Sequence, residues 1–205
     1  MILEGLVTTT DAEGRMHLAA MGPLVDDAEA AAGTVTRLVL RPFGTSQTAA
    51  NLARLPEGVF HLTDDVLVLA RVVAGGTEPA LAVGPARAVR GFVLTDACRG
   101  YEFRVVEADT RGERSRLEAR VVAEHAGRPF LGFNRAAHAV VEAAILVTRL
   151  HLLDLREIRG RFADLEPLVE KTGGDREREA FALLAACVGA AHGQTSSPGL
   201  AAHRA

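Results

Sequence analysis

Aromatic side chains are scarce in this chain of 205 residues: they make up 4% of it, with one tyrosine, Tyr101, and no tryptophan. Proteins that bind single-stranded nucleic acid stack bases on aromatic rings, and this chain has little from which to build such a platform. The formal net charge of −3 also lacks the basic footprint of DNA- and RNA-binding domains. We therefore expect no nucleic-acid partner, and a core made mostly of alanine, valine and leucine.

Cysteines and long apolar runs are also few. Cys98 and Cys187 are the only cysteines, and neither belongs to a Cys-x-x-Cys motif. This usage is typical of a reduced, cytoplasmic protein, although the redox state of the pair stays open. No charged segment followed by an apolar core opens the chain, so no secretory signal is predicted. The longest apolar run, residues 136–150, is interrupted by polar residues and is too short to cross a bilayer, so we expect no membrane partner.

The first part of the chain is rich in strand signals. Alternating and β-branched apolar runs, separated by turn residues, predict strands at residues 2–10, 16–21, 36–41, 58–63, 86–94, 101–108 and 115–123. In the last of these, Leu117, Ala119 and Val121 alternate with charged residues. Residues 46–55 are predicted to form a helix, whereas residues 66–73 fit a helix or a strand equally well. This order favours an antiparallel barrel or closed sheet.

The pattern turns helical after the break at residues 127–129. Asn134 can cap a long helix that runs to about residue 152 and is apolar on most of its surface, as buried helices and helices between subunits are. Asp154 resembles the start of a capping box for a second helix, which Pro167 is expected to interrupt or restart. A third helix is predicted over residues 175–191.

These signals predict a mainly β protein with helices, in the α+β class. Residues 1–130 are expected to form the barrel, residues 131–192 a helical extension and residues 193–205 a disordered tail.

The stretch between the third strand and the following helix is a candidate anion site. Backbone N–H groups at a helix start are unpaired and carry the positive end of the dipole. Thr45, Ser46 and Thr48 add hydroxyl groups there, and Arg41 adds a fork of charged donors. The alternative is a capped helix with a surface salt bridge, because the pattern is not a standard P-loop.

A polar stripe crosses the otherwise apolar helix that begins at Asn134. Asn134, His138 and Glu142 are four residues apart and so lie on one side of it, with Arg135 beside the first. Polar groups on a buried surface need partners, which here are a ligand or, alternatively, a cap plus a buried His138–Glu142 hydrogen bond. No His-Glu-x-x-His pattern and no third ligand accompany them, so no metal site is predicted.

His61 and Thr63 lie at a strand end, where ligand-contacting groups often occur, although a strand running into a polar turn explains them equally well. No Gly-x-Ser-x-Gly motif is present, and neither cysteine has an adjacent histidine in a recognisable motif. No catalytic residue is predicted.

Five blocks of the sequence together resemble a microbial domain-of-unknown-function family, number 447. They are ILEGLVTTT, AAMGPLVDD, RLVLRPFGTSQTAANL, VFHLTDDVLVLAR and FNRAAHAVVEAAILVTRLHLL. The likeness extends over residues 2–190, nearly the whole chain. It implies the FMN-binding split β-barrel fold of flavin reductases and pyridoxamine-phosphate oxidases, with a C-terminal helical extension. It also implies a homodimer that holds flavin near the subunit interface.

The resemblance assigns a ligand to the candidate residues. The FMN phosphate is expected at the strand–turn–helix corner, and Gly22 is expected to approach the isoalloxazine ring through its backbone. His61 and Thr63 would face the ring or the ribityl chain, and residues of the later helix would complete the pocket from either subunit. The expected cofactor-binding residues are Gly22, Arg41, Thr45, Ser46, Thr48, His61, Thr63, Asn134, Arg135 and His138.

The resemblance does not imply a known reaction. The leading hypothesis is an FMN-dependent oxidoreductase of the flavin-reductase-like class, in which the cofactor carries the chemistry. A non-catalytic module that carries or senses a flavin or another phosphorylated ligand is the alternative, and a scaffolding dimer with a vestigial pocket is a third. Relatives lie beside genes of pterin-dependent one-carbon metabolism, which suggests a pterin or folate-like substrate. The electron donor and acceptor stay open.

Overall fold

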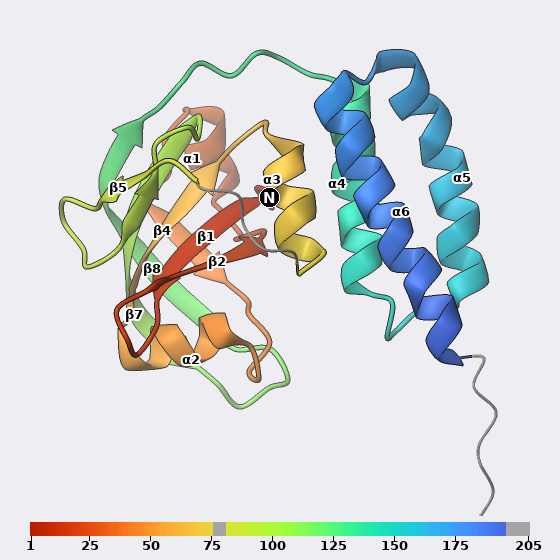
Figure 1. Ribbon diagram of the computed structural model, residues 1–205. Helices are drawn as coiled ribbons and strands as arrows, with labels where there is room; N and C mark the ends of the chain where they lie inside the picture. The colour runs from red at the N-terminus through yellow and green to blue at the C-terminus, as the bar shows by residue number, and fades with distance from the viewer. Residues whose placement is uncertain (76–80, 196–205) are drawn as a thin grey trace, which may run out of the picture. The chain divides into compact units, whose positions relative to one another are not determined.

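The computed structural model describes residues 1–75 and 81–195, which form two compact units (Figure 1). The first unit contains Met1–Asp65 and the described residues up to Gly132. The second contains the described residues that begin at Val66 and at Phe133. The segment that follows Asp65 clusters with the C-terminal helices in the second unit.

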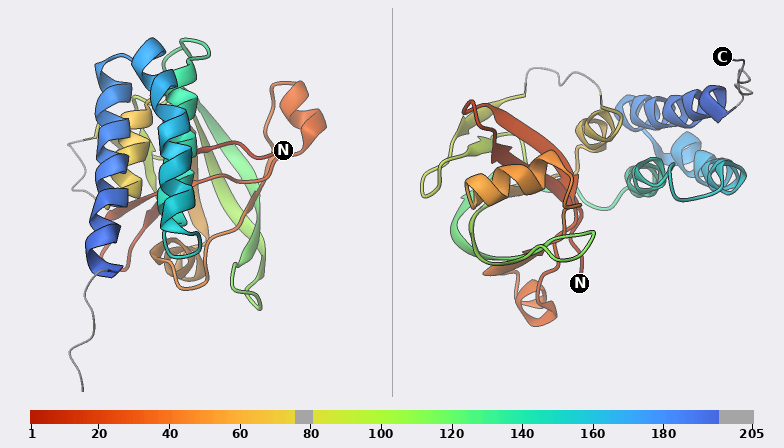
Figure 2. Two further views of the ribbon diagram at one scale, coloured as in Figure 1. Left: turned by 90° about the vertical axis from the view of Figure 1, so that its right-hand side faces the viewer. Right: turned by 90° about the horizontal axis from the view of Figure 1, so that it is seen from below.

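The first unit is built on one antiparallel sheet with the strand order β2-β1-β4-β7-β8-β3. Its strands are β1 (Gly5–Thr10), β2 (Met16–Met21), β3 (Arg37–Leu40), β4 (Glu57–Leu62), β7 (Arg99–Asp109) and β8 (Arg116–Ala126). Leu24 forms bridges to both Ile2 and Val39 and so links the two edges of the sheet. Figure 2 shows the sheet curling around its interior, with the helix α2 (Gln47–Arg54) across one end. The short helix α1 (Asp27–Ala31) connects β2 to β3.

Alternation along the strands places one apolar face inside this curled sheet. Phe60 and Tyr101 stack there with ring centroids 6.4 Å apart, and Leu52 of α2 joins the same cluster. Burying each such side chain stabilises the fold by about 1.5–3 kcal/mol. The fully buried members of the cluster include Val7, Leu38, Leu40, Phe60 and Phe103. The core of the first unit is therefore aliphatic with a few aromatic rings, as the composition predicts.

The predicted hairpin at the start of the chain is confirmed. β1 and β2 pair from Gly5 opposite Met21 to Thr10 opposite Met16. Gly14 in the turn has a φ of 83°, which favours glycine.

The predicted strand over residues 86–94 is mostly wrong. Only Phe92–Leu94 is a strand, β6, and it pairs with β5 (Val83–Pro85) in a separate two-stranded sheet. Residues 86–91 form the loop between them. The carboxylate of Glu102 accepts the N–H groups of Arg87, Ala88 and Val89, which therefore do not enter a strand ladder.

The second unit consists of the helices α3 (Val66–Val73), α4 (Arg135–Thr148), α5 (Leu155–Thr172) and α6 (Asp175–Thr195). The segment that fits helix or strand by sequence is thus a helix, and it contacts α4 and α6 (Figure 2). Its apolar side chains are buried at Val66, Leu67, Leu69 and Ala70. No helix in residues 1–75 and 81–195 has both the length and the apolar character needed to cross a membrane.

Two predictions about the helices need correction. Pro167 does not interrupt the second helix, because α5 continues through it to Thr172. Phe162, one turn earlier, packs against Phe181 of α6 with ring centroids 5.4 Å apart and holds this part of α5 in place. The third helix extends to Thr195, past the predicted start of the tail, and residues 196–205 of that tail lie outside the described residues.

Candidate functional site

The corner between β3 and α2 is held rigidly by the turn between β7 and β8. The N–H of Gly44 donates to the carbonyl of Glu113 at 2.9 Å, and the N–H of Ser115 donates to the carbonyl of Pro42 at 2.9 Å. The guanidinium of Arg114 lies 3.6 Å from the centre of the Phe43 ring, a cation–π contact. The backbone of this corner is therefore fixed from outside as well as by its own helix.

Ser46 caps α2, as the alternative interpretation of the stretch, a helix capped by Thr45 or Ser46, allows. Its hydroxyl oxygen accepts the N–H of Ala49 at 3.2 Å, and its hydroxyl donates to the carbonyl of Phe43 at 2.7 Å. Both hydroxyl functions of Ser46 are thus used within the chain. Its part in an anion site would be to orient the first turn of the helix.

Several donors at the corner are free. The side chains of Arg41 and Thr45 are exposed, and Arg41 forms no ion pair within the part of the chain that the structure describes. In the first turn of α2, the N–H groups of Gln47 and Thr48 likewise have no acceptor among the described residues. Free backbone donors at the positive end of a helix and an unpaired guanidinium suit an anion.

Thr48 faces the opposite way and is buried, with 3% of its surface exposed. Its hydroxyl lies 3.3 Å from Nε2 of His17 on β2. Burial lowers the pKa of His17, and the charge of Asp11 offsets this in part. His17 is therefore neutral at pH 7.

A hollow of about 550 Å³ opens beside this contact, between the β1–β2 turn and the start of α2. It is lined by Asp11, Ala12, Glu13, Arg15, Met16, His17 and Gln47. The sequence interpretation missed this site. The available signal was the hairpin register, which places His17 opposite Thr9 on the strand next to α2.

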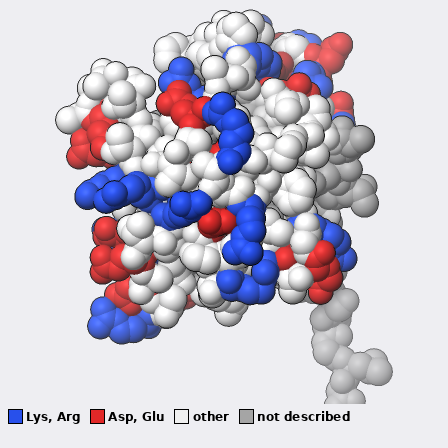
Figure 3. All heavy atoms as spheres, turned by 90° about the vertical axis from the view of Figure 1, so that its left-hand side faces the viewer, with Lys and Arg blue, Asp and Glu red and all other residues white. Residues whose placement is uncertain are grey.

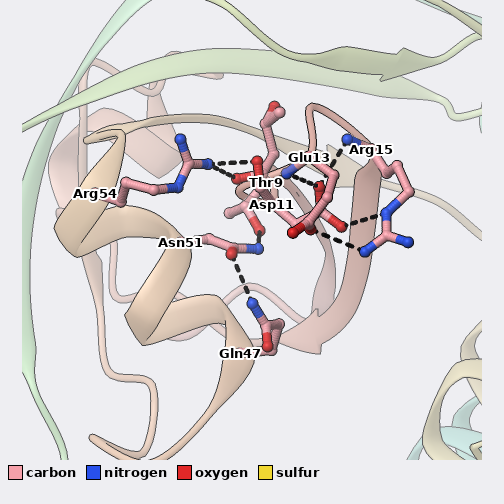
Figure 4. Close-up of polar contacts among 8 residues, drawn as sticks. Thr9, Asp11, Glu13, Arg15, Gln47, Asn51 and Arg54 are labelled. Carbon is pink, nitrogen blue, oxygen red and sulfur yellow. Dashed lines mark hydrogen bonds and ion pairs between the residues drawn. The ribbon is translucent and has the colours of Figure 1, made fainter.

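Hydrogen bonds join the wall of the hollow to α2 (Figure 4). The amide of Gln47 donates to Asn51 at 2.8 Å, and the amide of Asn51 donates to the hydroxyl of Thr9 at 2.9 Å. Arg54, one turn later, donates to the carbonyl of Asp11 at 2.6 Å. These bonds fix the turn relative to the helix.

The charges that line the hollow are paired with one another. Nε of Arg15 lies 2.7 Å from Asp11, and Nη2 of Arg15 lies 2.9 Å from Glu13 (Figure 4). The small burial of Asp11 would raise the pKa of its carboxyl, but hydrogen bonds and the charge of Arg15 outweigh it and lower that pKa. Asp11 and Arg15 are therefore charged at neutral pH, and the one guanidinium pairs with both acidic side chains.

Close packing around residue 22 leaves no room for a side chain, so glycine is required there. A Cβ there would lie 2.7 Å from Cγ2 of Ile2 and 2.9 Å from a carboxylate oxygen of Glu4. The residue follows β2 and is half-buried. Its contact with a flavin ring stays a prediction.

His61 is enclosed within the chain. Its ring is fully buried, and its Nε2 accepts the N–H of Leu94 at 3.0 Å. Thr63 accepts the N–H of Asp65 at 3.0 Å and forms the polar turn that the sequence offers as its alternative. Both side chains are thus hydrogen-bonded within the chain. Their contacts with a flavin stay predictions.

Asn134, Arg135 and His138 belong to the helical unit. The side-chain oxygen of Asn134 caps α4 by accepting the N–H groups of Ala136 and Ala137, and its amide donates to the carbonyl of Thr172. Arg135 and His138 are exposed.

The alternative hydrogen bond between His138 and Glu142 is not formed in the described chain, where both side chains are exposed. The ring of His138 instead meets that of Phe133 edge-on, with centroids 5.9 Å apart. The structure thus places Arg41, Thr45 and Ser46 at one corner, while the side chain of Thr48 turns to His17. A shared pocket with the α4 residues stays a prediction. In residues 1–75 and 81–195, no group of three or more His, Cys, Asp or Glu side chains is placed to hold a metal ion.

Two family models match the chain. The model described as "Protein of unknown function (DUF447) N-terminal domain" matches residues 3–128, and that described as "Protein of unknown function (DUF447)" matches residues 134–186. The chain belongs to the DUF447 family. The family resemblance of the sequence is therefore confirmed, while a comparison with curated proteins finds no match.

Solved structures share the fold of this DUF447 protein. An FMN-bound DUF447 protein from Methanosarcina mazei aligns with a TM-score of 0.76 at 19% identity, over 91% of this chain and 94% of that one. The styrene monooxygenase flavin reductase from Pseudomonas putida S12 aligns with a TM-score of 0.50 at 13% identity, over 62% of this chain and 82% of that one. At these identities the likeness is one of fold, and it confirms the predicted α+β architecture of flavin-reductase split barrels followed by helices.

Proposed function

We propose that this DUF447 protein binds FMN and acts as a flavin-reductase-like oxidoreductase. The observation that carries the proposal is the β3–α2 corner, where the exposed Arg41, which has no ion pair among the described residues, precedes a helix start with free N–H groups. FMN ends in a phosphate, and an anion of that kind suits both groups. The FMN-bound relative of the same fold and family supports the choice of ligand.

The residues present fit the cofactor in chemistry and in space. Arg41 and the N–H groups of Gln47 and Thr48 would hold the phosphate, with the hydroxyl of Thr45 as a further donor. Gln47 also lines the hollow of about 550 Å³, a volume within the usual range for ligand sites. Bound FMN supplies hydride or electron transfer, while the chain anchors the phosphate and holds the corner rigid.

The proposal includes a homodimer. Leu131 and Phe133, directly before α4, are 89% and 90% exposed. Covering such side chains with a second subunit would remove apolar surface from water, which favours association. A pterin or folate-like substrate stays a prediction from the family resemblance alone.

The phosphate seat is tested by titrating the protein with FMN and with riboflavin, which lacks the phosphate. Removing a charge-assisted hydrogen bond costs about 1.5–3 kcal/mol, so Arg41→Ala is expected to weaken FMN binding at least roughly tenfold. Riboflavin binding should not change. Arg156→Ala, at an exposed arginine of α5, is the matched control. Equal losses for both ligands would place the phosphate elsewhere, and no binding of FMN at all would reject the proposed function.

The paired charges of the hollow favour a second candidate function, a non-catalytic carrier or sensor of FMN. Asp11 and Glu13 are both engaged by Arg15, so neither carboxylate is free to transfer a proton. Anaerobic mixing of the FMN-loaded protein with NADH or NADPH separates the two functions. Rapid bleaching of the flavin absorbance supports the oxidoreductase, and an unchanged spectrum supports the carrier.

A further inference from the structure

Residues 86–94 cover the outer face of the sheet without pairing to it. β6, at the end of this segment, forms its ladder with β5 alone. Val89 and Val93 pack on Val59 of β4, on the face opposite to the core residue Phe60. The apolar part of this contact is therefore small, and the attachment depends largely on hydrogen bonds.

Glu102 of β7 holds the loop half of the segment. Its carboxylate is fully buried and accepts the N–H groups of Arg87 at 2.7 Å, Ala88 at 2.6 Å and Val89 at 3.0 Å. It also lies 2.5 Å from Nε2 of His125. Burial would raise the pKa of this carboxyl, but the backbone donors and His125 outweigh burial and lower it.

The rest of the segment is held by two further titratable side chains and by the hydroxyl of Thr8, which donates to the carbonyl of Phe92 at 2.6 Å. Nε2 of His61 accepts the N–H of Leu94 at 3.0 Å, and the carboxylate of Glu57 accepts the N–H of Arg90 at 2.8 Å. An imidazole can accept at Nε2 only while it is neutral. Protonation of His61 therefore removes the acceptor that Leu94 requires.

We propose that residues 86–94 form an acid-released cover, which detaches from the outer face of β4 and β7 when His61 is protonated, while the six-stranded sheet stays folded. Detachment would expose the apolar surface of Val59, Val89 and Val93.

His61 is the trigger because its ring is buried and the N–H of Leu94 already points at Nε2, where a second proton would have to bind. In the neutral form that accepts at Nε2, the proton is on Nδ1, which has no hydrogen-bond partner among the described residues. Burial, with a smaller contribution from His125, lowers the pKa of His61 to about 4, although the backbone of Leu6 offsets this in part. In the detached state the ring meets water and returns to its ordinary pKa of 6.5. The detached state thus binds the proton first, and acid favours it progressively from about pH 6.5 down to about pH 4.

Other charged groups around the segment form ion pairs, and basic and acidic side chains are interspersed on this side of the molecule (Figure 3). Glu57 lies 3.0 Å from Arg104 and 3.6 Å from Arg90, and its pKa is lowered because these arginines and the N–H of Arg90 outweigh its burial. Arg99 lies 3.1 Å from Glu124. The pKa values of the two carboxylates that hold the segment are therefore lowered from the ordinary value of 4.5, whereas a detached His61 gains its proton from about pH 6.5.

Hydrogen–deuterium exchange of the whole chain at pH 7.0 and pH 4.5, corrected for the intrinsic pH dependence of exchange, tests the proposal. The shift in the pKa of His61 predicts that exchange in residues 86–94 rises on the order of fiftyfold to a hundredfold at pH 4.5. Peptides from β1 and β7 should keep their protection. Equal loss of protection throughout the first unit would overturn the proposal, because the sheet would then unfold with the segment.

His61→Gln separates the trigger from general acid sensitivity. The glutamine oxygen can accept the N–H of Leu94 but does not titrate, so the acid response of residues 86–94 should fall at least tenfold. His151→Gln, at an exposed histidine of the helical unit, should leave the response unchanged. A full acid response in His61→Gln would overturn the role of His61. For a variant that fails to fold, the wild-type profile decides: a rise between pH 6.5 and 4 supports the proposal, and a flat profile over that range overturns it.

Discussion

At Gly127, directly after β8, the backbone lies very close to the backbone of Ala97 and Cys98. A Cβ at this position would lie 1.8 Å from the carbonyl oxygen of Ala97, which accepts the N–H of Arg128 at 3.2 Å. The N–H of Gly127 itself donates to the carbonyl of Cys98 at 3.1 Å. The backbone on both sides is thus hydrogen-bonded and has no freedom to retreat from a side chain.

We therefore expect Gly127→Ala to lower the free energy of unfolding by more than about 2 kcal/mol, since overpacking against backbone forces the chain to move. Gly160→Ala is the matched control, because Gly160 is an exposed residue of α5 with no atom near its added Cβ. That change should raise the free energy of unfolding by about 0.5–1 kcal/mol. Urea unfolding of both variants measures the two effects, and equal responses would contradict this account of Gly127.

At the scale of elements, local sequence signals and tertiary packing disagree in two places. Pro167 is a strong local signal for a break, yet α5 runs through it because Phe162 and Val169 on either side are buried against the bundle. Residues 86–91 look like a strand, yet the donors at 87–89 are taken by Glu102. In both cases partners distant in the sequence outweigh the local preference.

The proline in α5 predicts a stabilising substitution. Pro167 is exposed and lacks the N–H that would bond to the carbonyl one turn earlier. Pro167→Ala should restore that bond and raise the free energy of unfolding by about 1–3 kcal/mol. Glu170→Ala, at an exposed neighbouring position, should change it by less than about 0.5 kcal/mol. Thermal unfolding followed by circular dichroism compares them, and a lower melting temperature for Pro167→Ala would show that the helix needs the proline.

At the scale of the whole molecule, the two units are interleaved in sequence. α3 follows β4 directly, yet its buried side chains belong to the helical unit that begins again at Phe133. The boundary near residue 130 that the sequence suggests therefore separates α3 from its partners α4 and α6.

This interleaving predicts that a fragment of residues 1–130 aggregates when it is produced without the rest of the chain. It would carry the apolar face of Val66, Leu67, Leu69 and Ala70 without the helices that bury it. We expect aggregation in size-exclusion chromatography and strong binding of an apolar dye. The same fragment with Leu67→Ser and Leu69→Ser should be more soluble. A monomeric wild-type fragment that binds no dye would indicate that α3 packs on the first unit.

The sequence by itself determined the features that depend on neighbours in the chain. Turn residues, alternation and contiguous motifs predict the β1–β2 hairpin, the cap at Asn134, the helical second part and the family. The sequence also placed the donors of the β3–α2 corner together, because that corner is a continuous stretch of chain.

Only the tertiary structure decided which side chains are free and which are already used. His61 accepts a hydrogen bond from Leu94, thirty-three residues later, and Thr48 contacts His17, thirty-one residues earlier. Arg41 stays exposed. Periodicity cannot reveal such pairings, because a hydrogen bond between distant residues leaves no repeating pattern in the sequence. The same reason explains why the hollow beside α2 and the cover over β4 were visible only in the folded chain.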